Sequence, residues 1–291
     1  MGGSPQRYKR DFDRFGDVIY RSFPPAKINI TLDLLNLRED RYHNLETFVL
    51  KIPSFSDSLT LDTEGLMGGD LGEDNLITRA HKSMEQTVGK ELVAGWRLKK
   101  EIPVCGGFGG GSSDGWAALV LLNEAFSLGF SHHELVQIAI PLGCDLPLFS
   151  VDGPLWAKGK GTDVHPLSKR HSPLWVLLGV ADSPISTEEA FRWWEDSGFE
   201  GGERTKEVIQ WWETGDRRER CVHAGNDFER VVFPRRPELA EVIRGIRLTP
   251  VIASGMTGTG NGFFALYSKK ENAEEGGQSL TDSQFLGVYP L

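Results

Sequence analysis

The chain has 291 residues, 39% of them hydrophobic, which suits one large or two ordinary domains with a proper core. Its 41 acidic residues outnumber its 32 basic ones and give a net charge of −9, so broad binding to nucleic acid or to an anionic membrane is not expected. The three cysteines are widely separated and form no C-x-x-C pair, so neither a zinc site nor a disulfide framework is expected, and a reducing cytoplasm fits best.

Residues 1–21 are interpreted as a polar N-terminal extension, because the first 20 residues lack the apolar core of a signal peptide. No stretch approaches the roughly 20 apolar residues of a membrane span. The strict alternation of residues 26–35, AKINITLDLL, predicts a strand with Lys27 and Asn29 on its polar face. A polar turn over residues 38–44 follows, and then further strands.

The middle of the chain alternates between helix and strand signals. Residues 73–89 predict a helix that ends at its last glycine, and residues 95–104 predict a strand that leads into a glycine-rich loop. The helix after that loop is apolar nearly all round and should be buried. Ser131 and Glu134 form a capping-box pair for the next helix, which should stop at Gly143.

A polar joint at residues 167–174 predicts a domain boundary, with an N-terminal domain over residues 22–170 and a C-terminal domain over residues 171–291. Residues 195–222 are charged and, with the tryptophan pairs at 193/194 and 211/212, predict a surface helix pair with an aromatic underside and no assigned function. The remaining signals are a helix over residues 237–246 and a buried strand over residues 260–268.

The glycine-rich loop is the most informative part of the chain. Residues 103–114 read PVCGGFGGGSSD, and so many glycines bring backbone N–H groups close to a large negative group. The loop also opens a helix, for which Ser112, Ser113 and Asp114 are good N-cap residues. The amides and the positive dipole end of the first helical turn add to an anion site. A nucleotide phosphate is the expected ligand.

Three other interpretations compete with a nucleotide phosphate site. A Walker A loop requires a lysine directly after its last glycine, whereas Gly111 is followed by Ser112. A dinucleotide fingerprint would need a third glycine at position 112 and an acid about 20 residues downstream at the end of a second strand. A flexible surface loop rarely ends on helix caps and a buried helix. The phosphate site remains the best interpretation.

The same residues carry a resemblance to a known superfamily. PVCGGFGGGSSD resembles the phosphate-binding motif of the GHMP kinases, which include galactokinase and the homoserine, mevalonate and phosphomevalonate kinases. Three further segments narrow the similarity to the 4-diphosphocytidyl-2-C-methyl-D-erythritol kinases: PPAKINITLDLLNLREDRYHNLET, LGCDLPLF and SGMTGTGNGFFALY. The similarity runs from about Ser22 to Tyr267.

This resemblance implies an α/β (α+β) fold of two domains, a ribosomal-S5-like N-terminal domain that binds ATP and a ferredoxin-like C-terminal domain. It implies ATP with Mg²⁺ and phosphorylation of the 2-hydroxyl of 4-diphosphocytidyl-2-C-methyl-D-erythritol in the non-mevalonate route to isoprenoids. The alternatives are another GHMP kinase, acting on homoserine, mevalonate or a sugar, and a non-catalytic nucleotide-binding relative. We expect a cytoplasmic monomer or weak homodimer with a small-molecule substrate and no nucleic acid or membrane partner.

Phosphoryl transfer needs mostly positioning and charge neutralisation, with a carboxylate beside the attacking hydroxyl and a cation near both. Asp145 is the best candidate base, as the only acid in the apolar stretch LGCDLPLF, and the alternative is that it caps the next turn. A lysine on the polar face of a strand, such as Lys27, is usually only solvated. The resemblance implies that Asp145 is the catalytic base and that Lys27 keeps it ionised and orients the hydroxyl.

The resemblance also implies the binding residues. Tyr42 and Phe191 would stack on the cytosine ring while His43 reads its edge, although an aromatic residue is more often core and a lone histidine more often a surface or capping residue. The other predicted substrate-binding residues are Asn29, Thr187, Thr257, Gly258 and Thr259. The predicted ATP-binding residues are Pro103, Gly106, Gly107, Gly109, Gly110, Gly111, Ser112, Ser113, Asp114, Asn75 and Lys100. No metal ligand is assigned, because helix capping explains either serine equally well.

The chain departs from the family pattern at Gly115 and Trp116, where two small residues are usual. Trp116, placed in the first helical turn, is expected to crowd or reshape the phosphate site. Cys105 stands where a glycine or another small residue is usual, and Phe108 stands where leucine is common. None of these departures removes a predicted catalytic group.

Overall fold

The computed structural model describes residues 8–12, 18–66, 68–69, 71–168, 174–182, 184–214, 224–278, 280 and 283–291. Its contacts divide the chain into two compact units. The first unit consists of Met1–Ala26, Phe55–Pro103 and Gly109–Asp152, and the second of Lys27–Ser54, Val104–Phe108 and Gly153–Leu291. The boundary predicted at residue 170 stays a prediction, and residues 169–173 of the polar joint lie outside the described residues.

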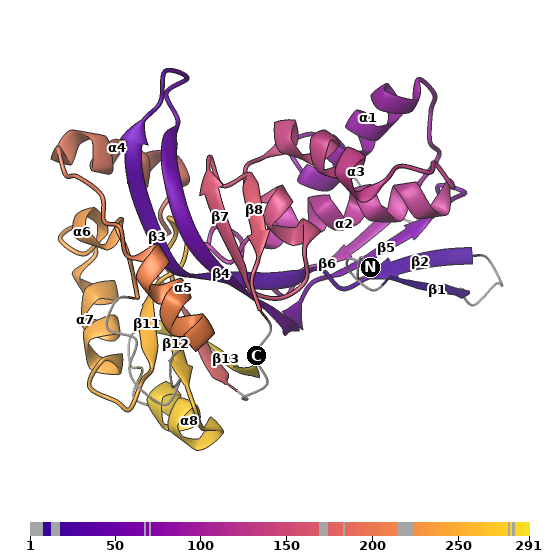
Figure 1. Ribbon diagram of the computed structural model, residues 1–291. Coiled ribbons are helices and arrows are strands. Elements are labelled where there is room, and N and C mark those ends of the chain that lie inside the picture. Colours follow the sequence, from indigo (N-terminus) through magenta and orange to yellow (C-terminus); the bar gives the residue numbers. More distant parts are fainter. Residues whose placement is uncertain are drawn as a thin grey trace. The chain divides into compact units, whose positions relative to one another are not determined.

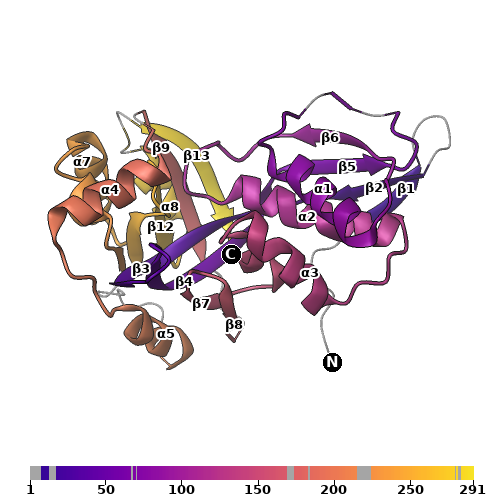
Figure 2. The same cartoon turned by 90° about the horizontal axis from the view of Figure 1, so that it is seen from above.

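The first unit is built on a four-stranded antiparallel sheet of order β1-β2-β5-β6. Its strands are β1 (Lys9–Phe12), β2 (Val18–Ser22), β5 (Ser58–Asp62) and β6 (Gly95–Lys99). Its helices are α1 (Leu76–Val88), α2 (Gly110–Ala125), α3 (His132–Ala139) and the 3₁₀ helices η1 (Ile140–Leu142) and η2 (Leu146–Ser150). Helices α1 and α2 pack together and lie across one face of this sheet (Figure 2).

The ends of α1 and the start of α3 confirm the capping signals in the sequence. Asn75 caps α1 by accepting a hydrogen bond from the backbone N–H of Ile77, and Gly89 ends the helix in the left-handed conformation, with φ of 68°. Ser131 and Glu134 form both bonds of the predicted capping box. After α3 the chain continues as η1 as far as Gly143.

Helix α2 begins earlier than predicted. Its N-cap is Gly109, with φ of 72°, and the backbone N–H of Ser113 donates to the Gly109 carbonyl at 2.9 Å. Ser112, Ser113 and Asp114 therefore lie inside the first turns, and the prediction that they cap the helix was wrong. The left-handed glycine starts the helix without a side-chain cap. The predicted burial of α2 is confirmed, since every residue from Trp116 to Leu122 is buried.

The second unit contains two sheets, of order β10-β3-β4-β7-β8 and β11-β12-β9-β13. The first comprises β3 (Pro25–Leu37), β4 (His43–Ser56), β7 (Leu155–Gly159), β8 (Asp163–Pro166) and β10 (Gly225–Asn226). The second comprises β9 (Trp175–Ala181), β11 (Ala253–Met256), β12 (Gly262–Tyr267) and β13 (Ser283–Pro290). The long strands β3 and β4, in indigo and purple, are neighbours in the first sheet (Figure 1).

The helices of the second unit agree only in part with the sequence signals, which indicated none over residues 229–232 or 270–278. They are α4 (Thr187–Ser197), α5 (Thr205–Thr214), α6 (Glu229–Val232), α7 (Pro237–Ile246) and α8 (Lys270–Gln278). The predicted aromatic underside is present where the structure describes it, because Trp194 on α4 and Trp212 on α5 are each only 4% exposed. The rest of that segment, residues 215–222, lies outside the described residues. The predictions that became α7 and β12 are confirmed.

Strand β3 confirms the prediction from alternation, but both of its faces are buried. Lys27 and Asn29 are 2% and 4% exposed, and Thr31 and Asp33 are fully buried. Alternation reports which side chains are polar and cannot tell a solvated face from a covered one. Buried polar groups need partners, so this face must be hydrogen-bonded. Among the described helices, none is long and apolar enough to cross a membrane.

Candidate active site

Lys27 is held at the start of the buried polar face of β3. Its ammonium Nζ donates a hydrogen bond to Asn29 Oδ1 at 2.6 Å, because residues two apart on a strand share a face. Its backbone N–H donates to the carbonyl of Phe108, at the end of the glycine-rich segment Val104–Phe108, at 2.9 Å. A solvated lysine would sample many rotamers, whereas this ammonium has a defined direction.

Asn29 joins Lys27 to the late glycine motif. Its Oδ1 also accepts from the backbone N–H of Gly258 at 3.0 Å and from Thr257 Oγ1 at 3.3 Å. Its backbone N–H donates to Thr257 Oγ1 at 3.1 Å. The structure therefore brings together four predicted site residues from two distant segments, since Thr257 lies 228 positions after Asn29 in the chain.

Two glycine segments of the second unit touch through their backbones. Gly107 has φ of 76°, and a Cβ there would lie 1.9 Å from the carbonyl oxygen of Thr257. Gly258 has φ of 61°, and a Cβ there would lie 3.1 Å from Gly107 Cα and 3.5 Å from Lys27 Nζ. Glycine at these positions is therefore required by loop packing, a reason that the sequence did not reveal.

The remaining threonines of the predicted substrate site also meet. Thr187, the first residue of α4, lies with its Oγ1 2.9 Å from the Oγ1 of Thr259. This hydrogen bond ties the start of α4 to the late glycine motif. The helix end itself is fixed by a capping box of Ser186 and Glu189.

Two of the three predicted base-binding residues are in contact. The rings of His43 and Phe191 meet edge-on with centroids 5.7 Å apart. Phe191 also packs edge-on against Phe228 at 4.9 Å. Tyr42 is 53% exposed, and the ammonium of Lys160 lies 4.2 Å from its ring centroid.

His43 is buried and chemically unsatisfied. Neither ring nitrogen has a hydrogen-bond partner among the described residues, and the Glu195 carboxylate lies 4.0 Å from Nε2. Burial lowers the pKa of His43, and the charge of Glu195 opposes this effect. A neutral imidazole offers one donor and one acceptor. His43 lines a hollow of about 790 Å³ together with residues that include Leu34, Trp194 and Phe199.

In the first unit, Lys100 is the centre of an ion cluster whose two carboxylates are buried. Its ammonium donates to Asp114 Oδ2 at 2.8 Å and also to Asp57 Oδ2. Asp57 Oδ1 accepts from the backbone N–H groups of Glu101 and Ile102 at 2.7 and 2.9 Å. The predicted nucleotide-side lysine is thus fixed by two carboxylates at the entry to the glycine loop. Asp57 was missed, because an acid between two strands reads as an ordinary turn residue.

The surroundings of Asp114 perturb its carboxyl group. Burial raises the pKa of Asp114 to about 7, the Asp57 charge adds to this, and the Lys100 ammonium opposes it. Burial alone would lower the pKa of Lys100, but its two acidic partners raise it above the ordinary value. Gly110 allows this packing, since a Cβ there would lie 3.1 Å from Lys100 Nζ.

The other predicted ATP-binding residues divide between the units. Those in the first unit are Asn75, Pro103, Gly109, Gly110, Gly111, Ser112, Ser113 and Asp114, and those in the second are Gly106 and Gly107. Ser113 is fully buried, and its Oγ has no hydrogen-bond partner among the described residues. Asn75 acts as the N-cap of α1.

Asp145 precedes the 3₁₀ helix η2 and belongs to the first unit, whereas Lys27 belongs to the second. Its carboxylate makes no capping bond to η2. The alternative that Asp145 serves as a helix cap therefore finds no support in this geometry.

The prediction that Trp116 lies in the first helical turn was wrong. Because α2 begins at Gly110, Trp116 lies in the second turn, where it is fully buried and meets His132 edge-on at 5.9 Å. Close packing explains the glycine at position 115, since a Cβ there would lie 3.0 Å from Leu76 Cβ on α1. Both departures from the family pattern are thus accommodated by the core of the first unit.

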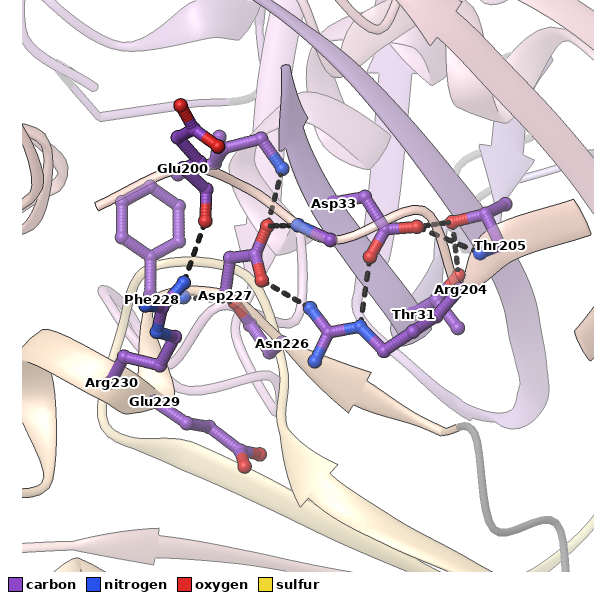
Figure 3. Close-up of polar contacts among 12 residues, drawn as sticks. Thr31, Asp33, Glu200, Arg204, Thr205, Asn226, Asp227, Phe228, Glu229 and Arg230 are labelled. Atoms are coloured by element: carbon purple, nitrogen blue, oxygen red, sulfur yellow. Dashed lines mark hydrogen bonds and ion pairs between the residues drawn. The ribbon is translucent and has the colours of Figure 1, made fainter.

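The sequence analysis also did not identify a second ion cluster. Arg204 lies between Asp33 and Asp227 in the second unit, with Thr205 beside them (Figure 3). Asp33 lies on the predicted polar face of β3, so alternation located it without indicating its partners.

Comparison with known proteins agrees with the fold. The GHMP kinases N terminal domain matches residues 75–152, and the GHMP kinases C terminal domain matches residues 215–285. A homoserine kinase from Cytophaga hutchinsonii shares the fold, with a TM-score of 0.65 at 17% identity over 97% of this chain and 96% of that one. Fold and domains are those of a small-molecule kinase of the GHMP class.

More similar proteins narrow this class. The 4-diphosphocytidyl-2-C-methyl-D-erythritol kinase of Pelotomaculum thermopropionicum is 32% identical over 274 residues, which cover 89% of this chain and 92% of that protein. That of Symbiobacterium thermophilum is 31% identical over 258 residues, 84% and 90% of the two chains. A crystal structure of 4-(cytidine 5'-diphospho)-2C-methyl-D-erythritol kinase has a TM-score of 0.77 at 26% identity and covers 93% of this chain and 97% of that one. The chain therefore belongs to the 4-diphosphocytidyl-2-C-methyl-D-erythritol kinase family of GHMP kinases, which confirms the resemblance and the fold class.

Proposed function

We propose that this chain transfers the γ-phosphoryl group of ATP to the 2-hydroxyl of 4-diphosphocytidyl-2-C-methyl-D-erythritol, a step of non-mevalonate isoprenoid biosynthesis. Family membership supports the reaction. The observation that carries it is the buried Lys27 ammonium, held on Asn29 beside the backbone of Gly258. A buried, oriented cation on a polar strand face is what transfer of a charged group requires.

The start of α2 suits the phosphates of ATP. The first amides of a helix have no intrahelical acceptor and carry the positive end of its dipole, and here they follow the left-handed Gly109. Mg²⁺ would come with the nucleotide and neutralise phosphate charge. Among the described residues, no group of three or more His, Cys, Asp and Glu could hold a metal ion.

The proposed chemistry uses Asp145 as base and Lys27 as cation. The substrate hydroxyl gives its proton to the Asp145 carboxylate as its oxygen forms a bond to the γ-phosphorus. The bond from that phosphorus to the bridging oxygen breaks, and ADP leaves. Lys27 would keep the carboxylate ionised and orient the hydroxyl.

We further propose that the cytosine ring binds beside His43. The neutral imidazole can both donate to and accept from the base edge, and Phe191 supplies an aromatic surface next to it. Tyr42 is exposed enough to close over the ring from the other side. We also propose that the enzyme acts on small molecules in the cytoplasm, as a monomer or weak homodimer.

A substrate panel tests the function. ADP release would be measured with the cytidylylated methylerythritol, with free methylerythritol, and with homoserine and mevalonate. We expect turnover only with the cytidylylated substrate, and phosphorus NMR should show a new phosphomonoester at its 2-position. Turnover of homoserine or mevalonate instead, or ATP binding without turnover of any acceptor, would refute the proposal.

A further inference from the structure

A buried charge cluster lies farther along the polar face of β3 from Lys27. Arg204 joins its two acids (Figure 3): Nε donates to Asp33 Oδ1 at 3.0 Å, and Nη2 donates to Asp227 Oδ1. The side chains of Asp33 and Asp227 are 1% and 2% exposed. Two buried carboxylates are costly unless a cation pairs with both, and the rigid fork of a guanidinium can do so.

One arm of hydrogen bonds leads from Asp33 to Asn29. Asp33 Oδ2 accepts from the backbone N–H and the hydroxyl of Thr205, both at 2.7 Å. Thr205 Oγ1 lies 2.8 Å from Thr31 Oγ1. Thr47 Oγ1 donates to the backbone carbonyl of Thr31 at 2.6 Å and accepts from Asn29 Nδ2 at 2.8 Å.

The other arm leads from Asp227 to Gly258. Asp227 Oδ2 accepts from the backbone N–H groups of Leu34 at 2.8 Å and Gly202 at 2.9 Å. The adjacent Asn226 is 2% exposed, and its Nδ2 donates to the carbonyl of Gly258 at 2.7 Å. Strand β10, which contains Asn226, pairs in parallel with β3. The two arms thus converge on the amide and the backbone that surround the Lys27 ammonium.

We propose that Arg204 is a positioning residue for phosphoryl transfer. By holding two buried carboxylates it fixes β3 and β10, and through them the Asn29 amide and the Gly258 backbone that orient Lys27. This inference rests on the proposed function. It requires Arg204 to affect turnover, because its two arms end at Asn29 and Gly258, which orient Lys27. Both residues are also predicted to bind substrate, so a rise in KM alone would report binding and not positioning.

Steady-state kinetics of three variants tests the inference. Arg204→Ala should lower kcat by about 10- to 100-fold, as expected when a reacting group moves by roughly 1 Å, and should change KM for the cytidine substrate less than kcat. Arg204→Lys keeps the positive charge but lacks the two-pronged guanidinium, so its kcat should lie between those of the wild type and Arg204→Ala. Asn226→Asp keeps the acceptor for the backbone N–H of Phe228 but loses the donor to Gly258, and should lower kcat as well.

Arg235→Ala is the matched control. Arg235 donates to the backbone carbonyl of Val231 and lies over the ring of Trp193, and it belongs to neither arm. It should keep wild-type kcat. Millimolar guanidinium, but not sodium chloride of equal ionic strength, should restore part of the kcat of Arg204→Ala, since it can refill the space between the carboxylates.

Rates are measured well below the melting temperature of each variant, so that unfolding does not contribute. The inference is overturned if the folded variants keep wild-type kcat, if the loss appears in KM alone, or if guanidinium raises the melting temperature without raising kcat. If Arg204→Ala does not fold, the kcat values of Arg204→Lys and Asn226→Asp test the inference instead. Failure of the wild-type enzyme to turn over the cytidylylated substrate would remove the proposed function, and wild-type turnover by Lys27→Ala would remove the role of Lys27. Inactivity of Lys27→Ala beside fully active Arg204→Lys and Asn226→Asp variants would remove only the positioning role.

Discussion

Gly107→Ala is the sharpest test of the contact between the two glycine segments. The added Cβ would lie 1.9 Å from the carbonyl oxygen of Thr257, so this carbonyl must retreat by about 1 Å or more. The left-handed φ of 76° adds about 1–2 kcal/mol of strain, and overpacking adds typically 1–3 kcal/mol. Together these terms should lower the melting temperature by roughly 5–10 °C.

The displaced Thr257 and Gly258 share Asn29 with Lys27, so the catalytic geometry should move with them. We expect kcat to fall by about 100-fold, measured by coupled ADP release well below the melting temperature. Gly89→Ala is the matched control: its φ is 68°, but nothing lies within 4 Å of an added Cβ. It should show the strain alone, a smaller loss of melting temperature and normal kcat. Equal behaviour of the two variants would refute the steric argument.

Three further predictions follow from the site. Asp145→Asn should cut kcat by roughly 10²- to 10⁴-fold and leave ATP affinity nearly intact. Adding Lys27→Ala should lower kcat little further, because the two residues act as one unit. Near-normal turnover of Asp145→Asn would end the assignment of Asp145 as the base. Phe191→Ala should weaken binding of the cytidine substrate by about 1–3 kcal/mol, measured as a higher KM. His43→Ala should reduce the discrimination against uridine analogues. An unchanged KM in both variants would refute the proposed cytosine pocket. The pKa of Asp114 is raised to about 7, so the folded state holds its proton more tightly, and this contribution to stability is present at low pH and is lost as pH rises through about 7. The melting temperature of Asp114→Asn relative to wild type should therefore increase from pH 5 to pH 8, and a constant difference would contradict the coupling.

The sequence by itself determined the elements whose signals are local. Strand alternation located β3, glycine ended α1 at Gly89, and Ser131 with Glu134 marked the start of α3. These features depend on residues a few positions apart, so a short window contains their physical cause. The ordered motifs likewise sufficed for the family, because a motif is a local pattern of residue types.

Only the tertiary structure decided which polar groups are buried together. Alternation placed Lys27 and Asn29 on one face, but several partners that make this face a network, Thr257 and Arg204 among them, lie more than 170 positions away. Likewise, Gly107 read as a phosphate-loop glycine, and its clash partner Thr257 comes from a distant strand end. Burial, ion pairing and close backbone approach depend on distances that chain order does not encode, so these parts of the site could be known only after the chain was folded.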